Sequence, residues 1–201
     1  MNEDIRRALT VTIGDSFPLI SILNKGDWFS IHQESGQTVK RFEQLRKTRG
    51  SPRCNIIIIQ SFGNFTSPRS PNVIIINEFS YIFFPGRQTE ILPSVDFDSK
   101  IKKLINQYTN QSQYFVPRIG ICAFARFDPL FSHTSIETLE KPSTQQESLL
   151  ILKRAISTYL HDIIHLFGLE HYIYYLCLMN GANCEDEMNG QLIYLCPICL
   201  Q

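Results

Sequence analysis

The chain has 201 residues, 43% of them hydrophobic, which suits one globular domain with a sizeable core. Its 19 lysine and arginine residues balance 19 aspartate and glutamate residues, so a basic surface for nucleic acid is not expected. No stretch approaches the roughly 20 apolar residues of a membrane span, and we expect no secretory signal in the polar N-terminus. We therefore expect an intracellular monomer, cytoplasmic or nuclear, with no nucleic-acid and no membrane partner.

The N-terminal part of the chain predicts a polar arm that leads into a buried strand. Residues 1–52 are interpreted as an N-terminal arm and linker, and residues 53–201 as the main domain. Within the arm, residues 41–47 favour a short helix in a stretch rich in arginine, lysine and glutamine. Residues 56–59 form a continuous isoleucine run, which is typical of a buried strand.

A helix and a second strand are predicted next. Residues 73–84 are ambiguous by periodicity alone, but their length and the preceding Ser70-Pro71 pair favour a helix. Residues 90–95 indicate a strand. Because Pro93 has no N–H to donate to a neighbouring strand, this strand is expected near a sheet edge.

The middle of the chain leads into one long helix. Residues 98–107 place apolar side chains at helical spacing and predict a surface helix that covers the sheet. Residues 119–127 alternate as a strand does, either as a core strand or as an edge strand that pairs with extended substrate. Residues 132–148 are polar and predict a loop. Residues 149–160 then begin a helix that runs into three closely spaced histidines.

The pattern His-x-x-x-His-x-x-Gly-x-x-His holds three of the five histidines in the chain. At about 3.6 residues per turn, His161 and His165 lie one turn apart on one helix face and can reach a single zinc ion. His171 would point away if the helix continued, so the chain must turn back, which Gly168 allows. Three neutral ligands leave a fourth position for water, as in catalytic zinc sites. Ordinary helix histidines are the alternative, which this clustering disfavours.

A methionine and three cysteines after the histidines make the pattern more specific. Met179 follows the third histidine closely, Cys177 lies just before it, and Cys196-Pro-Ile-Cys199 comes near the end of the chain. This combination resembles the archaemetzincins, a branch of the metzincin zinc peptidases in which a methionine turn lies under the metal. The resemblance implies one catalytic zinc at the histidines, Met179 as its apolar floor, and a second, structural zinc.

The same resemblance implies a four-cysteine site for the second zinc. Cys177, Cys196 and Cys199 match three of its ligands, but the position of the remaining one, directly after the third histidine, is Tyr172 here. Cys184 lies near in sequence and is a possible fourth ligand. Three thiolates with water or a histidine, or a pair of buried thiols without metal, remain open. Metal-like cysteine spacing fits zinc in a reducing compartment better than disulfides.

The resemblance begins at about residue 26 and is strongest to the eukaryotic archaemetzincins. It implies an α/β (α+β) fold with a metzincin-like mixed sheet and the long zinc-binding helix in an N-terminal part, residues 53–168. A small C-terminal subdomain, residues 169–201, would hold the second zinc. Family members carry a further strand between the counterparts of residues 98–114 and 116–120. The chain lacks this stretch, so a splice variant or a decaying paralogue is plausible.

The acid beside the first histidine is Asp162, where metzincins carry a glutamate that acts as the catalytic base. Aspartate is one methylene shorter, which withdraws its carboxylate by roughly 1.5 Å. Proton transfer needs heavy atoms within about 2.6–3.2 Å, and general acid–base catalysis contributes about 10²–10⁴ in rate. We expect most of that contribution to be missing, while zinc binding is kept because the acid is not a ligand.

Three hypotheses follow from these residues. The first is a zinc metallopeptidase of reduced activity that cleaves a peptide or protein substrate. The second is a catalytically inactive pseudopeptidase that keeps its metals and binds peptides or proteins. The third is a small zinc-knuckle interaction protein in which only the cysteines matter.

Overall fold

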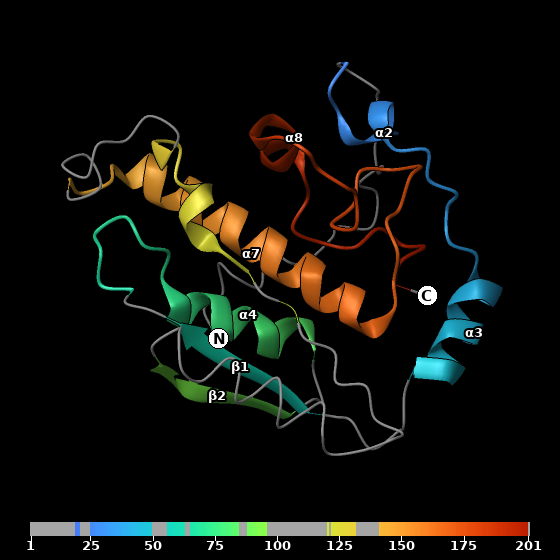
Figure 1. Ribbon diagram of the computed structural model, residues 1–201, viewed down its shortest axis with the longest axis horizontal. Coiled ribbons are helices and arrows are strands. Elements are labelled where there is room, and N and C mark those ends of the chain that lie inside the picture. Colours follow the sequence, from blue (N-terminus) through green and yellow to red (C-terminus); the bar gives the residue numbers. More distant parts are fainter. Residues whose placement is uncertain are drawn as a thin grey trace. The chain divides into compact units, whose positions relative to one another are not determined.

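The computed structural model describes most of the chain outside the first residues and the segment between the second strand and the long helix (Figure 1). The described residues are 19–20, 25–49, 56–62, 65–84, 88–95, 120, 122–131 and 141–200. The chain divides into two compact units, one of residues 1–49 with 156–201 and the other of residues 50–155. The predicted division after residue 52 stays a prediction. The predicted helix at 98–107 lies outside the described residues.

A β-α-β arrangement forms the described sheet of the unit of residues 50–155. Strand β1, Ile56–Phe62, pairs in parallel with β2, Gln88–Val95, and helix α4, Val73–Phe83, lies between them in the chain. Asn72 caps α4 by accepting hydrogen bonds from the N–H groups of the first turn. Both predicted strands and the predicted helix are confirmed. Within the described residues the sheet has these two parallel strands, so the expected mixed sheet is not shown.

The strand predicted at residues 119–127 is wrong for its described C-terminal part. Phe124–Phe127 form a short 3₁₀ helix, η1, which is followed by a turn at Asp128. The Asp128 carboxylate accepts a hydrogen bond from the N–H of Leu130 at 2.9 Å, which holds that turn. A buried ion pair fixes the same carboxylate, and alternation in the sequence cannot reveal this contact. The edge strand for substrate is therefore not formed by these residues.

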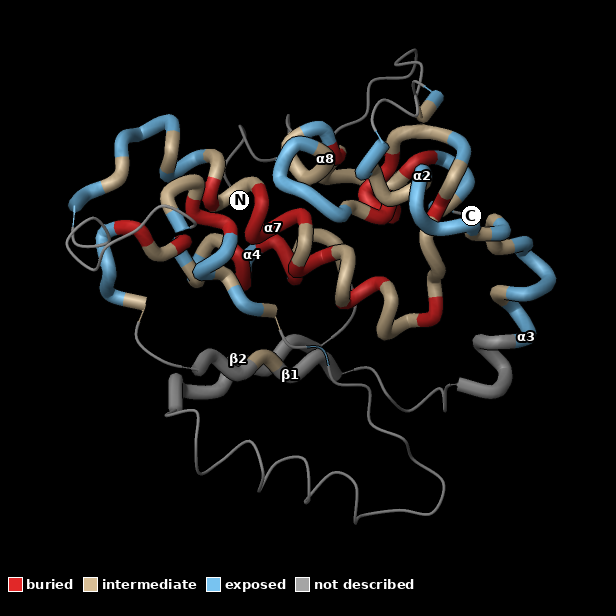
Figure 2. Tube along the Cα trace, turned by 45° about the horizontal axis from the view of Figure 1, so that its top comes forward, coloured by how far each residue is buried: buried red, intermediate tan, exposed pale blue. Residues whose placement is uncertain are grey.

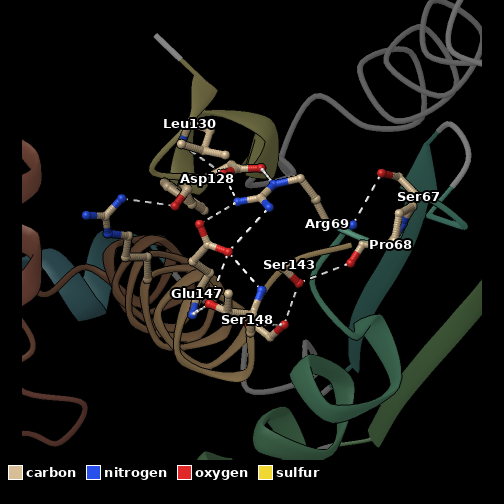
Figure 3. Close-up of polar contacts among 11 residues, drawn as sticks. Ser67, Pro68, Arg69, Asp128, Leu130, Ser143, Glu147 and Ser148 are labelled. Carbon is tan, nitrogen blue, oxygen red and sulfur yellow. Dashed lines mark hydrogen bonds and ion pairs between the residues drawn. The ribbon is translucent and has the colours of Figure 1, made fainter. Parts of the chain in front are cut away.

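The buried ion pair joins Arg69 to Asp128 (Figure 3). Arg69 donates through Nε to Oδ2 at 2.6 Å and through Nη2 to Oδ1 at 2.8 Å, and both side chains are almost fully buried. Glu147 contributes a second carboxylate, with Oε1 at 3.3 Å from Nη2 of Arg69. Hydrogen bonding to Arg69 holds the pKa of Asp128 below its ordinary value. The pair ties η1 to the segment that precedes α4.

Helix α7, Gln145–Phe167, begins earlier than predicted and takes in the end of the predicted loop. Its start is a reciprocal cap, because Glu147 N–H donates to Thr144 Oγ1 at 3.2 Å and Thr144 N–H donates to Glu147 Oε2 at 2.8 Å. The Thr-x-x-Glu signal for this start is present in the sequence. Buried residues recur along the apolar face of α7 (Figure 2), and they include Ile151, Ala155, Tyr159, Leu160, Ile163 and Ile164.

The unit of residues 1–49 and 156–201 is mostly irregular chain around the C-terminal half of α7. It contains α2, Trp28–Ile31, α3, Val39–Arg49, and α8, Glu185–Gly190, so the helix predicted at residues 41–47 is confirmed. In the C-terminal coil, a buried side-chain amide makes hydrogen bonds to the backbone. Asn180 accepts from Cys177 N–H at 2.7 Å and donates to the Tyr172 carbonyl at 2.6 Å. None of the helices in the described segments has the length and apolarity that a membrane crossing requires.

Candidate metal centre

The three histidines of the motif lie together, as their spacing predicts. His161 and His165 come from the last two turns of α7, with ring centroids 4.4 Å apart. The helix then ends at Gly168, which has a φ of 98°, a value that only glycine adopts without strain. This turn brings His171 back, so one ring nitrogen from each of the three histidines lies within 4.8 Å of the others.

The Nδ1 atom of each histidine lies within hydrogen-bond distance of an oxygen acceptor. Nδ1 of His161 lies 2.8 Å from the carbonyl oxygen of Leu178, and Nδ1 of His165 lies 2.6 Å from that of Leu169. Because a carbonyl only accepts, both Nδ1 atoms carry the proton and donate it. Nδ1 of His171 lies 2.9 Å from Oε1 of Glu34, to which it donates in the same way. The three Nε2 atoms are left with free lone pairs.

The free Nε2 atoms are placed as ligands of one ion would be. Nε2 of His161 lies 3.2 Å from Nε2 of His171. Two nitrogens each about 2.0–2.1 Å from a tetrahedral zinc ion are roughly 3.3–3.4 Å apart, so the observed separation fits a shared metal. Burial lowers the pKa of His161 to about 3 and also lowers the pKa of His165, so both rings are neutral at pH 7, as metal ligation requires.

Met179 follows Leu178, the residue whose carbonyl accepts from His161. Met179 is fully buried, and its carbonyl accepts a hydrogen bond from Tyr172 N–H at 2.8 Å. The preceding carbonyl, that of Leu178, accepts from both His161 Nδ1 and Gln191 Nε2, each at 2.8 Å. The role of Met179 as the apolar floor under the metal stays a prediction.

The predicted base, Asp162, follows His161 on α7 and is partly buried. Its charge acts on His165, where it works against the lowering of the pKa by burial. This places a carboxylate near the ligand set, and its catalytic role stays a prediction.

The N-terminal segment supplies contacts to this site that sequence reasoning missed. Besides Glu34, Gln37 spans the turn after α7, donating from Nε2 to the Gly168 carbonyl and accepting at Oε1 from Glu170 N–H, both at 3.0 Å. Trp28 stands edge-on to His171 with ring centroids 4.9 Å apart. These residues lie more than 130 positions from their partners, so no local sequence pattern predicts these contacts.

Three of the four cysteines singled out by sequence form a second cluster. The sulfur atoms of Cys177, Cys196 and Cys199 lie within 4.8 Å of one another, and the first two residues are fully buried. The N–H of Cys196 donates to Sγ of Cys177 at 3.2 Å. Hydrogen bonding from Cys199 lowers the pKa of Cys177 to about 6 and raises the pKa of Cys199. A thiolate is thus favoured at Cys177 near neutral pH.

Cys184, the possible fourth ligand, does not join this cluster. It is exposed and lies instead with Asp27 and Glu187, whose carboxylate accepts from Trp28 N–H at 2.8 Å. Burial raises the pKa of Tyr172, and interactions with the three cysteines of the cluster raise it further. Its hydroxyl is buried and has no hydrogen-bond partner within the described segments.

Four features together define a candidate zinc centre of the metzincin type. They are a histidine pair on one helix, a glycine turn, a third histidine brought back by that turn, and a buried methionine. The donor set fits zinc, which is commonly bound in proteins by three histidine nitrogens with one position left open.

Several known proteins match part of the chain. Archaemetzincin-2 of Homo sapiens is 33% identical over 97 residues, which cover 41% of this chain and 27% of that protein. Archaemetzincin-1 of Homo sapiens is 30% identical over 106 residues, covering 43% and 21%. Archaemetzincin of Thermococcus kodakarensis is 32% identical over 59 residues, covering 29% and 30%. No family model and no solved structure matches the chain.

These matches show that the chain is similar to the archaemetzincins over about two fifths of its length. The chain spans about a quarter of the length of the Archaemetzincin-2 proteins that it matches.

Proposed function

We propose that the chain is a zinc metallopeptidase of the archaemetzincin type, with peptides or proteins as substrates and with reduced activity. One observation carries the proposal: three Nε2 lone pairs converge while every Nδ1 is already fixed by an acceptor. A metal ion bound by the three nitrogens would make their close approach favourable.

The ligands would be His161, His165 and His171. When bound, zinc would acidify a water molecule and polarise the peptide carbonyl. Asp162 would accept the proton of the attacking water and pass it to the leaving amine. Its carboxylate is set back by one methylene relative to glutamate, about 1.5 Å, so this transfer is slow unless a second water relays the proton.

We further propose a second, structural zinc at Cys177, Cys196 and Cys199 in a C-terminal subdomain of residues 169–201. Two buried sulfurs and a lowered pKa at Cys177 support this assignment, because zinc binds thiolates. The remaining position would be taken by water or by the hydroxyl of Tyr172. The complete metzincin-like mixed sheet belongs to the same proposal.

The second candidate function is that of a pseudopeptidase, which keeps its metals and binds peptides without cleaving them. The residues that favour it are Asp162 at the position of the base and Tyr172 at the position of a cysteine ligand. Both departures leave the three-histidine geometry intact, so metal binding alone does not distinguish the two functions.

Peptidase assays on zinc-loaded protein distinguish them. The wild type should cleave members of a broad peptide library slowly, and Asp162→Glu should raise the rate by about 10-fold or more because the base regains its reach. His165→Ala, which removes a ligand, is the matched negative control. If neither the wild type nor Asp162→Glu cleaves any peptide while both hold zinc, the peptidase proposal is wrong and the pseudopeptidase remains.

A further inference from the structure

We propose that Glu34 is a positioning residue of the three-histidine site, which holds His171 in the tautomer and orientation that direct Nε2 toward the metal. The inference deepens the proposed function and rests on it. Glu34 lies in the coil between α2 and α3, outside every motif that marks the site.

The contact has the geometry of a charge-assisted hydrogen bond. Oε1 of Glu34 lies 2.9 Å from Nδ1 of His171, and the two side chains are only 26% and 17% exposed. A carboxylate that accepts from the outer nitrogen of a histidine fixes the ring and increases the basicity of the inner nitrogen. Glu34 therefore supplies a contact that a metal ligand needs.

The burial of Glu34 argues that the carboxylate serves this site. Its other oxygen, Oε2, is buried and has no hydrogen-bond partner among the described residues. A desolvated carboxylate oxygen without a partner is unfavourable for stability, so this side chain is costly to keep here unless its placement has another use.

His171 needs such support more than the other two histidines do. His161 and His165 stand on α7, and each donates to a backbone carbonyl. His171 lies in irregular chain after the glycine turn, where no helix fixes its side chain. A side chain from another part of the sequence does this instead.

The segment that carries Glu34 is itself held in place on both sides. On the C-terminal side, Gln37 bonds to the backbone on both sides of Leu169, at the Gly168 carbonyl and the Glu170 N–H. On the N-terminal side, Trp28 packs so closely on Gly181 that an added Cβ there would lie 2.5 Å from indole atoms. These contacts on both sides hold the segment that carries the carboxylate.

Two measurements on the full chain test the proposal. The first is the tautomer of His171 in metal-free protein above pH 8, read from the ¹⁵N shifts of labelled histidine. The second is zinc affinity by competition with a chelator, with the Co²⁺ absorption spectrum as a report of geometry. The variants are Glu34→Ala and Glu34→Gln, and Glu43→Ala, which changes an exposed glutamate on α3, is the control.

The expected result is a His171 ring with its proton on Nδ1 in the wild type and a mixture of both tautomers in Glu34→Ala. Zinc binding in Glu34→Ala should weaken by about 10–100-fold, with an altered Co²⁺ spectrum. Glu34→Gln keeps an acceptor and should retain the Nδ1 proton and most of the affinity. Glu43→Ala should match the wild type in every reading.

An unchanged tautomer in Glu34→Ala overturns the proposal, whatever zinc does. It is also overturned if Glu34→Ala binds zinc as tightly as the wild type, or if Glu34→Gln loses as much zinc affinity as Glu34→Ala. Zinc affinity that does not depend on His165 would instead contradict the proposed metal site, while the tautomer reading still decides the role of Glu34.

Discussion

Gln37 pairs with Gly168 across 131 positions of sequence, donating its side-chain amide to the glycine carbonyl at 3.0 Å. The same amide group accepts from Glu170 N–H, so one side chain clamps the backbone where α7 ends and the chain turns back toward His171. The geometry of the returning histidine therefore depends on the N-terminal segment as well as on the motif.

Replacing this amide should loosen the turn. In Gln37→Leu two hydrogen bonds are lost and two partly buried backbone groups lose their partners, so the free energy of unfolding should fall by about 1–3 kcal/mol. Urea denaturation of the metal-free protein measures this change. Gln33→Leu, at an exposed position nearby, should change it by less than about 0.5 kcal/mol. Equal effects of the two substitutions would argue against the clamp.

A second prediction follows from the positive φ of Gly168. Gly168→Ala forces a Cβ into the left-handed region, at about 1–2 kcal/mol, and displaces the turn that returns His171. Both thermal stability and zinc affinity should fall. Gly26→Ala is the matched control because open space surrounds that glycine. If Gly168→Ala kept the zinc affinity of the wild type, the turn would not be what places the third ligand.

The ion pair of Arg69 and Asp128 should be important for the stability of its own unit. Arg69→Ala leaves a buried carboxylate without its partner and should lower the free energy of unfolding by about 3 kcal/mol. Arg126→Ala, which removes an exposed arginine, should have little effect in the same urea titration. A loss below about 1 kcal/mol in Arg69→Ala would show that the pair is not a significant source of stability.

Acid should destabilise the metal-free protein through His161. In the folded state this ring stays neutral down to about pH 3, whereas in the unfolded state it takes a proton near pH 6.5. Between these values the unfolded state binds more protons, so stability falls as pH falls through this window. The melting temperature of His161→Gln should depend less on pH between pH 6.5 and 4 than that of the wild type. Parallel pH profiles would contradict the burial of a neutral ring.

The sequence predicts the parts of the site that are local and misses those that are not. Helix periodicity and one glycine predict that His161, His165 and His171 lie together, because this motif spans only eleven residues. Glu34 carries no signal, since its contact with His171 spans 137 positions.

In the fold, too, local features are predictable from the sequence and long-range contacts are not. The isoleucine run at residues 56–59 predicts β1 because a short continuous run of β-branched residues favours a strand. The alternation at residues 119–127 misled, because the contact of Asp128 with Arg69 decides that turn. The start of α7 was predictable from the cap formed by Thr144, and it was missed because the surrounding polar residues suggested a loop.

Zinc content per chain, measured after removal of loosely bound metal, tests the central claim most directly. The account predicts two zinc ions in the wild type and one in His165→Ala, because the cysteine cluster keeps its own ion. One zinc ion that survives His165→Ala unchanged would contradict a metal centre at the histidines, and would leave a zinc-knuckle protein in which only the cysteines matter.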